Sequence, residues 1–240
     1  MNTLLKYWPY AHIAYQYPDG KEALFHTAID FIPLDFELDF GYIVRFRDCI
    51  LYVCRGTKEL TTKAGLKAWR RNFDNFPKEK GHIHHGFYDA WMPFKPEINA
   101  YLRILQKKKS LVLPPIYCTG HSRGGCPAIL CARHIAKNLK IPCSCITYGN
   151  PRCGDKVFRN EFHMLPIDCI GVKNGYDIVM GLPPKSLGFR HVGRSYWIPQ
   201  PFYHALFCKI HDHKPESYNY ALNKHFKNQI VSSSESSLIL

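Results

Sequence analysis

Apolar runs of strand length alternate with amphipathic stretches of helix length along most of this chain. Alternation over residues 36–40 predicts one strand, and apolar runs predict further strands at 49–54, 115–119, 142–148, 167–173 and 189–198. The spacing of apolar positions predicts helices at 85–109, 126–140, 155–163 and 215–226, after a helix-rich, aromatic segment over 1–30. Strands that alternate with helices predict an α/β fold, with a mostly parallel central sheet and helices on both faces.

The chain length and the turn signals predict a single domain over residues 1–228. A chain of 240 residues is long enough for one substantial core, and no internal repeat or linker divides it. Pro93 and Pro96 are expected to kink or split the helix at 85–109, because proline lacks the N–H that a helix interior uses. The Ser-rich residues 229–240 predict a disordered tail.

The stretch Gly120-His121-Ser122-Arg123-Gly124 joins a predicted strand to a predicted helix. In a G-x-S-x-G pattern the serine occupies a strained turn, where side chains at the two glycine positions would collide with neighbouring backbone. The turn exposes the hydroxyl and directs the next N–H toward a helix N-terminus, where an oxyanion is stabilised. The pattern therefore predicts a nucleophilic serine, although a glycine-rich turn without chemistry fits the same residues.

A serine nucleophile needs a histidine as base and a carboxylate that orients this histidine. In folds with this turn the carboxylate follows the serine along the chain, and the histidine follows the carboxylate. Asp177 comes just after a predicted strand and is the expected carboxylate, with Asp168 inside that strand as its rival. His211 and His213 precede the last predicted helix, where a loop is expected. The full set of later histidines is His191, His204, His211, His213 and His225.

The charge of the chain limits the partners that we expect. With 32 Lys and Arg against 19 Asp and Glu, the net charge is +13. This excess favours an anionic partner such as a lipid surface, although a solvated basic surface explains it equally well. No basic helix carries base-reading residues, so no nucleic-acid partner is expected. No C-x-x-C pair, phosphate-binding loop motif or dinucleotide motif occurs, so we expect neither metal nor cofactor. The sequence leaves the oligomeric state open.

The sequence also indicates a compartment. Residues 1–16 lack the continuous apolar region of a secretory signal, and no run of about 18 apolar residues occurs. Several of the ten cysteines lie in predicted core strands and helices, which favours reduced thiols. We therefore expect a cytoplasmic protein, with peripheral contact to an anionic membrane surface left open.

Seven segments carry recognisable short motifs in chain order. They are Arg55-Gly56-Thr57, His85-Gly86-Phe87-Tyr88, residues 119–125, residues 147–155, residues 174–184, residues 189–193, and Asp212-His213 with Tyr218. Together they resemble the class 3 lipase family, the fungal-lipase-like branch of the α/β-hydrolases. The resemblance covers about residues 10–225, and the motifs are specific in combination.

The resemblance implies an α/β-hydrolase fold and a serine hydrolase that cleaves carboxylic esters of lipids. It implies an enzyme of the triacylglycerol lipase or phospholipase type, which works through an acyl-enzyme intermediate. By the same resemblance Ser122 is the nucleophile, Asp177 the orienting acid and His213 the base, with His211 as the alternative base. Two alternatives remain: an idle fold that binds a lipid or a partner, and a thioesterase or small-ester esterase.

Further residues receive roles by the same resemblance. Backbone N–H groups of Thr57 and Arg123 form the implied oxyanion hole. Arg123 replaces an apolar residue of the family, and its charge either favours an anionic substrate or binds a structural carboxylate. Cys126 stands where a smaller residue is usual, and its volume is tolerable. His121 and His191 fall at positions that are structural in the family.

Residues 58–80 correspond to the lid segment of the family. Apolar side chains recur there at helical spacing among basic residues, and they are Leu66, Trp69, Phe73 and Phe76. A basic amphipathic helix of this kind is expected to cover Ser122 in water and to open on anionic lipid. A helix that packs on the core with a wet basic face is the alternative.

Overall fold

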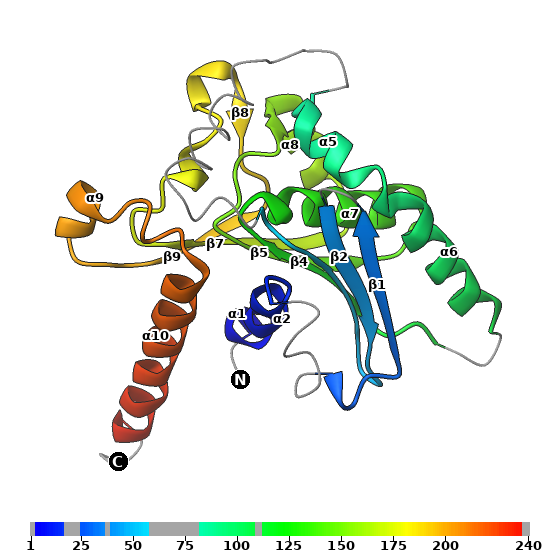
Figure 1. The fold of residues 1–240 in the computed structure, drawn as a ribbon, viewed down its shortest axis with the longest axis horizontal. Helices are drawn as coiled ribbons and strands as arrows, with labels where there is room; N and C mark the ends of the chain where they lie inside the picture. Colours follow the sequence, from blue (N-terminus) through cyan, green and yellow to red (C-terminus); the bar gives the residue numbers. More distant parts are fainter. Residues whose placement is uncertain (1–2, 17–24, 37–38, 58–81, 109–111, 237–240) are drawn as a thin grey trace.

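The computed structural model describes residues 3–16, 25–36, 39–57, 82–108 and 112–236, with the backbone alone over 227–236. Its centre is a seven-stranded sheet in the order β1-β2-β3-β4-β5-β7-β9 (Figure 1). The pairs from β3 to β9 are parallel, whereas β1 and β2 add antiparallel at one edge. The predicted mostly parallel sheet is therefore confirmed. The strands are β1 (Asp30–Phe36), β2 (Asp39–Arg45), β3 (Ile50–Cys54), β4 (Ile116–His121), β5 (Cys143–Tyr148), β7 (Ile167–Asn174) and β9 (Arg194–Ile198).

The central strands are apolar because they are covered on both sides. Every residue of β3 is buried, and β4 and β5 each have a single half-buried residue, Tyr117 and Ser144. Outside this sheet, β6 (Gly154–Asp155) and β8 (Phe189–Arg190) pair as a separate two-stranded sheet.

Helices cover both faces of the sheet, as predicted (Figure 1). One face holds α5 (His85–Trp91), α6 (Phe94–Lys107), α7 (Gly125–Asn138) and α8 (Lys156–His163). The other holds α1 (Thr3–Lys6), α2 (Trp8–Ile13) and α10 (Pro215–Ser236). Short helical turns lie at Ser122–Gly124, Val179–Gly181 and Lys185–Leu187, and α9 (Tyr203–Phe207) follows β9. Among the helices that the structure describes, none combines the length and the hydropathy of a membrane span.

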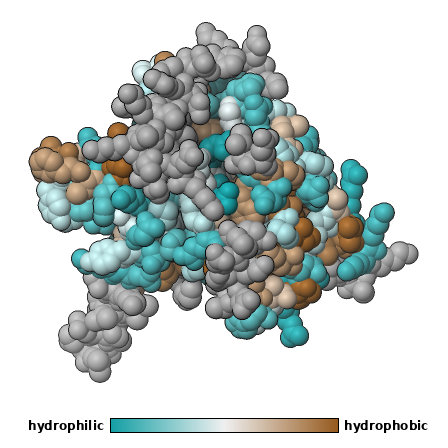
Figure 2. Space-filling model, in the orientation of Figure 1, coloured by the Kyte–Doolittle hydropathy of each residue, from teal (hydrophilic) through white to brown (hydrophobic). Residues whose placement is uncertain are grey.

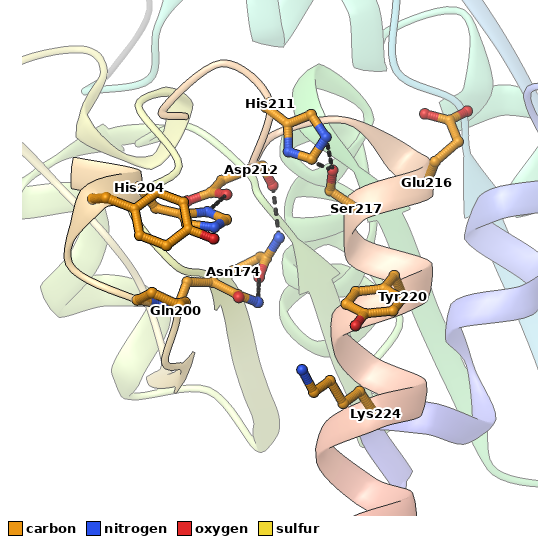
Figure 3. Close-up of a pocket in the computed structure, with 11 residues that line it drawn as sticks. Asn174, Gln200, His204, His211, Asp212, Glu216, Ser217, Tyr220 and Lys224 are labelled. Atoms are coloured by element: carbon orange, nitrogen blue, oxygen red, sulfur yellow. Dashed lines mark hydrogen bonds and ion pairs between the residues drawn. The ribbon is translucent and has the colours of Figure 1, made fainter. Parts of the chain in front are cut away.

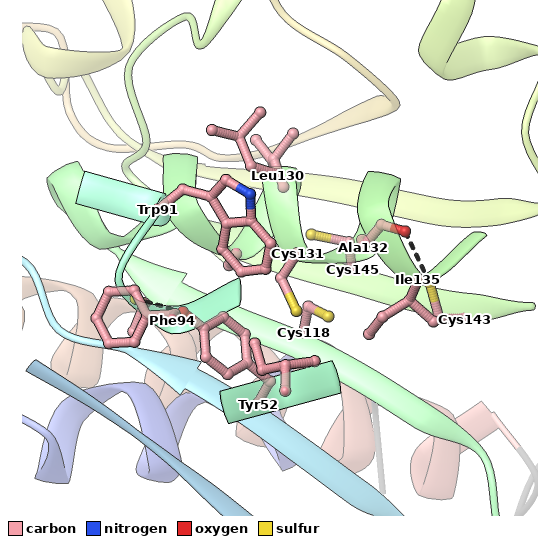
Figure 4. Close-up of a cluster of buried hydrophobic side chains, with 14 of the residues drawn as sticks. Tyr52, Trp91, Phe94, Cys118, Leu130, Cys131, Ala132, Ile135, Cys143 and Cys145 are labelled. Atoms are coloured by element: carbon pink, nitrogen blue, oxygen red, sulfur yellow. Dashed lines mark hydrogen bonds between the residues drawn. The ribbon is translucent and has the colours of Figure 1, made fainter. Parts of the chain in front are cut away.

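Two apolar clusters form the core, one on each face of the sheet. Cys131 and Ile135 of α7 belong to the same buried cluster as Tyr52, Trp91 and Phe94 (Figure 4). Nine of the ten cysteines are buried and all ten are free thiols, so they serve as small apolar side chains.

Two predicted strands are divided in the structure. The alternation over residues 36–40 spans the end of β1 and the start of β2, where Phe36 pairs with Asp39 in antiparallel register. The expected strand at 189–198 is split between the two sheets, because Gly193 has a φ of +68° and redirects the chain. Both predictions of a single strand were therefore wrong, since neither alternation nor an apolar run reveals where the chain leaves one strand and enters the next.

The predicted helix at 85–109 is split where proline was expected to split it. α5 ends at Trp91 and α6 begins directly after Pro93. Pro96 lies in the first turn of α6, where an N–H has no partner within the helix and its loss costs little. At the C-terminus α10 continues to Ser236, into the segment 229–240 for which the sequence predicts a disordered tail. Extending an existing helix is far easier than starting one, even through serine.

Candidate active site

The G-x-S-x-G stretch forms a sharp turn between β4 and α7. Ser122 has a φ of +58°, a left-handed conformation that L-residues adopt at a cost in strain. A Cβ on Gly120 would lie 2.5 Å from the carbonyl oxygen of Gly124, so a side chain does not fit there. The strained strand-to-helix turn predicted from the sequence is therefore confirmed.

Ser122, His213 and Asp177 form one chain of hydrogen bonds. Ser122 Oγ lies 2.8 Å from His213 Nε2, and His213 Nδ1 lies 2.9 Å from Asp177 Oδ2. Because an ionised carboxylate only accepts, Nδ1 carries the proton and Nε2 accepts from the serine hydroxyl. All three residues are at most 5% exposed. This geometry lets an imidazole take the proton of a nucleophilic serine.

Tyr218 and a backbone N–H hold the carboxylate of Asp177 in place. The Tyr218 hydroxyl donates to Oδ2 at 2.7 Å, and the N–H of Val179 donates to Oδ1 at 2.8 Å. Burial raises the pKa of Tyr218 well above 10, which keeps its hydroxyl a donor. Both oxygens of Asp177 are thus satisfied, as a buried carboxylate requires.

His121 holds the backbone of His213, the residue whose ring contacts Ser122. His121 Nε2 donates to the carbonyl oxygen of His213 at 3.0 Å, and Nδ1 accepts from the Tyr15 hydroxyl at 2.8 Å. Burial lowers the pKa of His121 well below 6.5, so this ring is neutral. The two imidazoles stack with centroids 4.9 Å apart. His121 therefore contacts His213 in a structural role. Nothing in the sequence indicated that Tyr15 would contact His121.

Gly149 lets the chain pass directly behind the hydrogen-bonded residues. Its φ is +58°, and a Cβ there would lie 2.7 Å from Asp177 Oδ2, 2.9 Å from the Tyr218 hydroxyl and 3.2 Å from His213 Nδ1. The sequence motif over residues 147–155 includes Gly149 but does not reveal this close approach to the carboxylate.

Thr57 lies beside the serine, in the loop that follows β3. It lines a cavity of about 10 Å³ together with Ser122 and His213, enough for about one water. A Cβ on the preceding Gly56 would lie 3.0 Å from Ser122 Cβ, so this loop contacts the turn directly. The expectation of an exposed hydroxyl is wrong, since Ser122 is 1% exposed.

Arg123 directs its side chain to the sheet. Its Nη1 lies 2.5 Å from Asp39 Oδ1 at the start of β2. Of the two roles considered for this charge, the structure shows the structural carboxylate. The backbone of Arg123 is part of the helical turn Ser122–Gly124, directly after the serine.

The remaining candidates contact other partners. His211 faces Ser217, whose Oγ lies 3.2 Å from its Nδ1, and Asp168 pairs with Arg194 at 2.6 Å on the exposed surface. His191 donates to a backbone carbonyl. Of the two histidines left open by the loop position, His213 is the one that contacts the serine.

The predicted lid falls outside the described residues, and so do its apolar side chains Leu66, Trp69, Phe73 and Phe76. Over the part of the chain that is described, no three His, Cys, Asp or Glu side chains gather as metal ligands.

Residues 51–187 match the Lipase (class 3) family. A lipase of Rhizomucor miehei is 35% identical over 124 residues, a match that covers 48% of this chain and 32% of that protein. The secreted mono- and diacylglycerol lipase 1 of Fusarium solani is 33% identical over 116 residues, covering 48% and 34%. The chain thus spans about a third of the length of these relatives.

Solved structures agree with the fold. Lipase II of Rhizopus niveus superimposes with a TM-score of 0.70 at 24% identity, covering 82% of this chain and 80% of that one. A triacylglycerol lipase described as having a serine protease triad as its catalytic centre gives 0.63 at 24% identity, covering 82% and 79%.

A parallel sheet, a serine on a strand-to-helix turn and a buried Ser–His–Asp chain define an α/β-hydrolase. Because the family match covers more than half of the sequence, the chain belongs to the class 3 lipase family.

Proposed function

We propose that this chain hydrolyses carboxylic esters of lipids, with Ser122 as nucleophile, His213 as base and Asp177 as orienting acid. The observation that carries the proposal is the unbroken hydrogen-bond chain from Ser122 Oγ through both nitrogens of His213 to Asp177. Because Nδ1 of His213 donates its proton to Asp177, only Nε2 can accept the proton of Ser122.

The reaction begins when Ser122 Oγ attacks the ester carbonyl carbon and His213 Nε2 takes the hydroxyl proton. The imidazolium that forms is stabilised by Asp177, and it returns the proton to the departing alcohol as the C–O bond breaks. Water then attacks the acyl-serine by the same proton route and releases the fatty acid. Tyr218 and Val179 donate to Asp177, which holds its carboxylate in place beside the imidazolium.

The negative charge on the carbonyl oxygen is stabilised by two backbone N–H groups, from Thr57 and Arg123, with the Thr57 hydroxyl assisting. Two contacts support this assignment. Thr57 lines the same small cavity as Ser122, and Arg123 directly follows Ser122 within the helical turn Ser122–Gly124.

The substrate class rests on relatives. The family is named for lipases, and the similar proteins include a triacylglycerol lipase and a mono- and diacylglycerol lipase. A lipid ester is the substrate that this kinship favours, of the triacylglycerol lipase or phospholipase type. Headgroup and acyl length are left to measurement.

A fluorophosphonate probe tests the nucleophile. It labels the wild-type chain and fails to label Ser122→Ala, because only an activated serine attacks phosphorus. His211→Gln serves as the matched control and keeps its labelling. An unlabelled wild-type chain would make the fold an idle one that binds a lipid or a partner.

A substrate panel separates the ester classes. Rates on emulsified triacylglycerol, phospholipid vesicles, a soluble short-chain ester and an acyl thioester are compared for one preparation. The proposal expects the lipid esters to give the highest kcat/KM. A thioester or a soluble ester in that position would assign the chain to the thioesterases or small-ester esterases.

A cytoplasmic location is part of the same proposal, and the ten free thiols support it. The Fusarium solani relative is named as secreted, so the two compartments are clear alternatives. Fractionation of expressing cells against compartment markers decides between them.

A further inference from the structure

The segment that contains α9 exposes a group of large apolar side chains. Phe202 is 73% exposed, Tyr203 57%, Leu206 64% and Phe207 83%. Figure 2 shows apolar colour at the left edge of the molecule, where Figure 1 places α9. Single exposed apolar residues are ordinary, but four within six positions on one projecting turn indicate a contact surface.

The position of α9 relates this surface to the active site. β9 runs parallel to β7, and β4 runs parallel through β5 to the same strands. The carboxyl ends of β4 and β9 therefore meet at one edge of the sheet, so Ser122 after β4 and α9 after β9 project from that edge. A lipid surface bound by α9 therefore lies at the same edge of the sheet as Ser122.

The inner side of α9 is polar and is tied to the loop of the catalytic imidazole. His204 Nδ1 lies 2.6 Å from Asp212 Oδ1 (Figure 3). The N–H of Tyr176 donates to Asp212 Oδ2 at 2.9 Å. Asp212 is 1% exposed and directly precedes His213. The helical turn is therefore held by its polar side, which leaves the apolar side chains to face outward.

Charge indicates what these side chains contact. Between α9 and α10 lies a pocket of about 370 Å³, lined by Tyr203 of α9 and by Glu216, Tyr220 and Lys224 of α10 (Figure 3). Tyrosine and lysine beside an apolar tip are the side chains that favour the headgroup layer of a bilayer. The net charge of +13 adds a long-range attraction to anionic lipid.

The size of the patch argues for lipid over protein. Given their exposed fractions, the four side chains offer roughly 500 Å². A stable protein interface buries about 800 Å² on each partner. Lipid insertion needs no such area, since each apolar side chain partitions independently.

We propose that α9 and Phe202 form an anchor that inserts into the surface of an anionic lipid bilayer and brings the Ser122 edge of the sheet to it. The anchor is separate from the predicted lid at 58–80. The proposed ester hydrolysis gives the anchor its purpose, and this proposal rests on it in that respect only. Binding of α9 to the bilayer does not depend on it.

Vesicle sedimentation tests the anchor in the full chain with Ser122→Ala, which prevents hydrolysis of the vesicles. The vesicles are phosphatidylcholine alone, or with about one quarter phosphatidylglycerol. Phe202→Ser with Phe207→Ser is expected to lower the partition coefficient on the anionic vesicles by at least about tenfold. The matched control is Val112→Ser with Met164→Ser, which are 89% and 86% exposed elsewhere and should change binding by less than about twofold.

Each outcome decides the proposal. A loss of binding restricted to the α9 variant, greater on anionic than on neutral vesicles, supports it. Equal binding by both double variants, no binding by the parent chain, or equal binding to both vesicles overturns it. A dimer that the α9 variant dissociates would make the patch an interface between copies, and would overturn it too.

Soluble-ester hydrolysis by the chain with Ser122 intact reports the proposed function separately. The α9 variant should keep that rate, since Phe202 and Phe207 contact none of the reacting groups. Vesicle binding without ester hydrolysis would refute the proposed function and leave the anchor standing. Hydrolysis without α9-dependent binding would refute the anchor alone.

Discussion

Gly149→Ala should impair catalysis, because the added methyl group would contact the carboxylate of Asp177. Residues that contact the substrate should be unchanged. The added Cβ would lie 2.7 Å from Asp177 Oδ2 and 2.9 Å from the Tyr218 hydroxyl. Both distances are below 3.0 Å, closer than Cβ atoms approach other heavy atoms in proteins. Either the carboxylate or the turn must therefore move by a few tenths of an ångström. The residue also has a φ of +58°, which alanine adopts at a cost of about 1–2 kcal/mol.

The two effects have different readouts. The backbone cost lowers Tm by about 2–4 °C for each kcal/mol in a chain of this size. Displacement of Asp177 lowers kcat, and because a 1 Å misplacement costs about 10²-fold, a shift of a few tenths of an ångström should lower kcat by about three- to tenfold. KM for a soluble ester should stay the same, since Asp177 does not contact substrate.

Two glycine controls separate these effects. Gly188 has a φ of +90° with nothing within 4 Å of an added Cβ, so Gly188→Ala carries the backbone cost alone. Gly181 has open space and no positive φ, so Gly181→Ala should be silent. The assay is kcat and KM on a soluble ester beside thermal unfolding. If Gly149→Ala kept the kcat of Gly188→Ala, the close approach would have no catalytic meaning and this reasoning would be refuted.

Three further results are expected. His213→Gln should lower kcat at least about 10³-fold and His211→Gln less than about twofold, measured on a soluble ester; a reversal would exchange their roles. Burial lowers the pKa of His191 from 6.5 to about 4, so stability present above pH 6.5 is lost as the pH falls from 6.5 toward 4, by up to about 3 kcal/mol. Urea unfolding across that range should show a smaller loss in His191→Gln than in wild type, because His84 and His121, whose pKa burial also lowers, still contribute. A thiol reagent should titrate Cys208 rapidly in the native chain and all ten thiols in denaturant, because the other nine are buried; rapid reaction of several native thiols would contradict the packing.

Sequence reasoning found the elements that have a strong local signal. The turn around Ser122 was predictable because its glycines are required by short-range contacts. The sheet was predictable because buried parallel strands are apolar along their length, as β3 is. The break at Pro93 was predictable because proline has one dominant effect on a helix.

Contacts between distant segments were not predictable in the same way. Tyr15 lies 106 residues from His121, and nothing in its neighbourhood indicates that its hydroxyl donates to that ring. The approach of Gly149 to Asp177 depends on how two loops meet in space. The pairing of His204 with Asp212 likewise depends on how α9 folds back, although both residues were visible as titratable groups.

The proposed catalytic machinery extends beyond the part of the chain that matches the family. The match over residues 51–187 contains Ser122 and Asp177 but not His213 or Tyr218. The opposite end of the chain contributes too, since Trp8 packs against His121 with centroids 5.7 Å apart and against Tyr218 at 5.6 Å. These contacts place α2 and α10 together behind the imidazole that faces the serine. Both helices are therefore needed to position the base, and a fragment limited to the matched residues would keep the nucleophile without its proton acceptor.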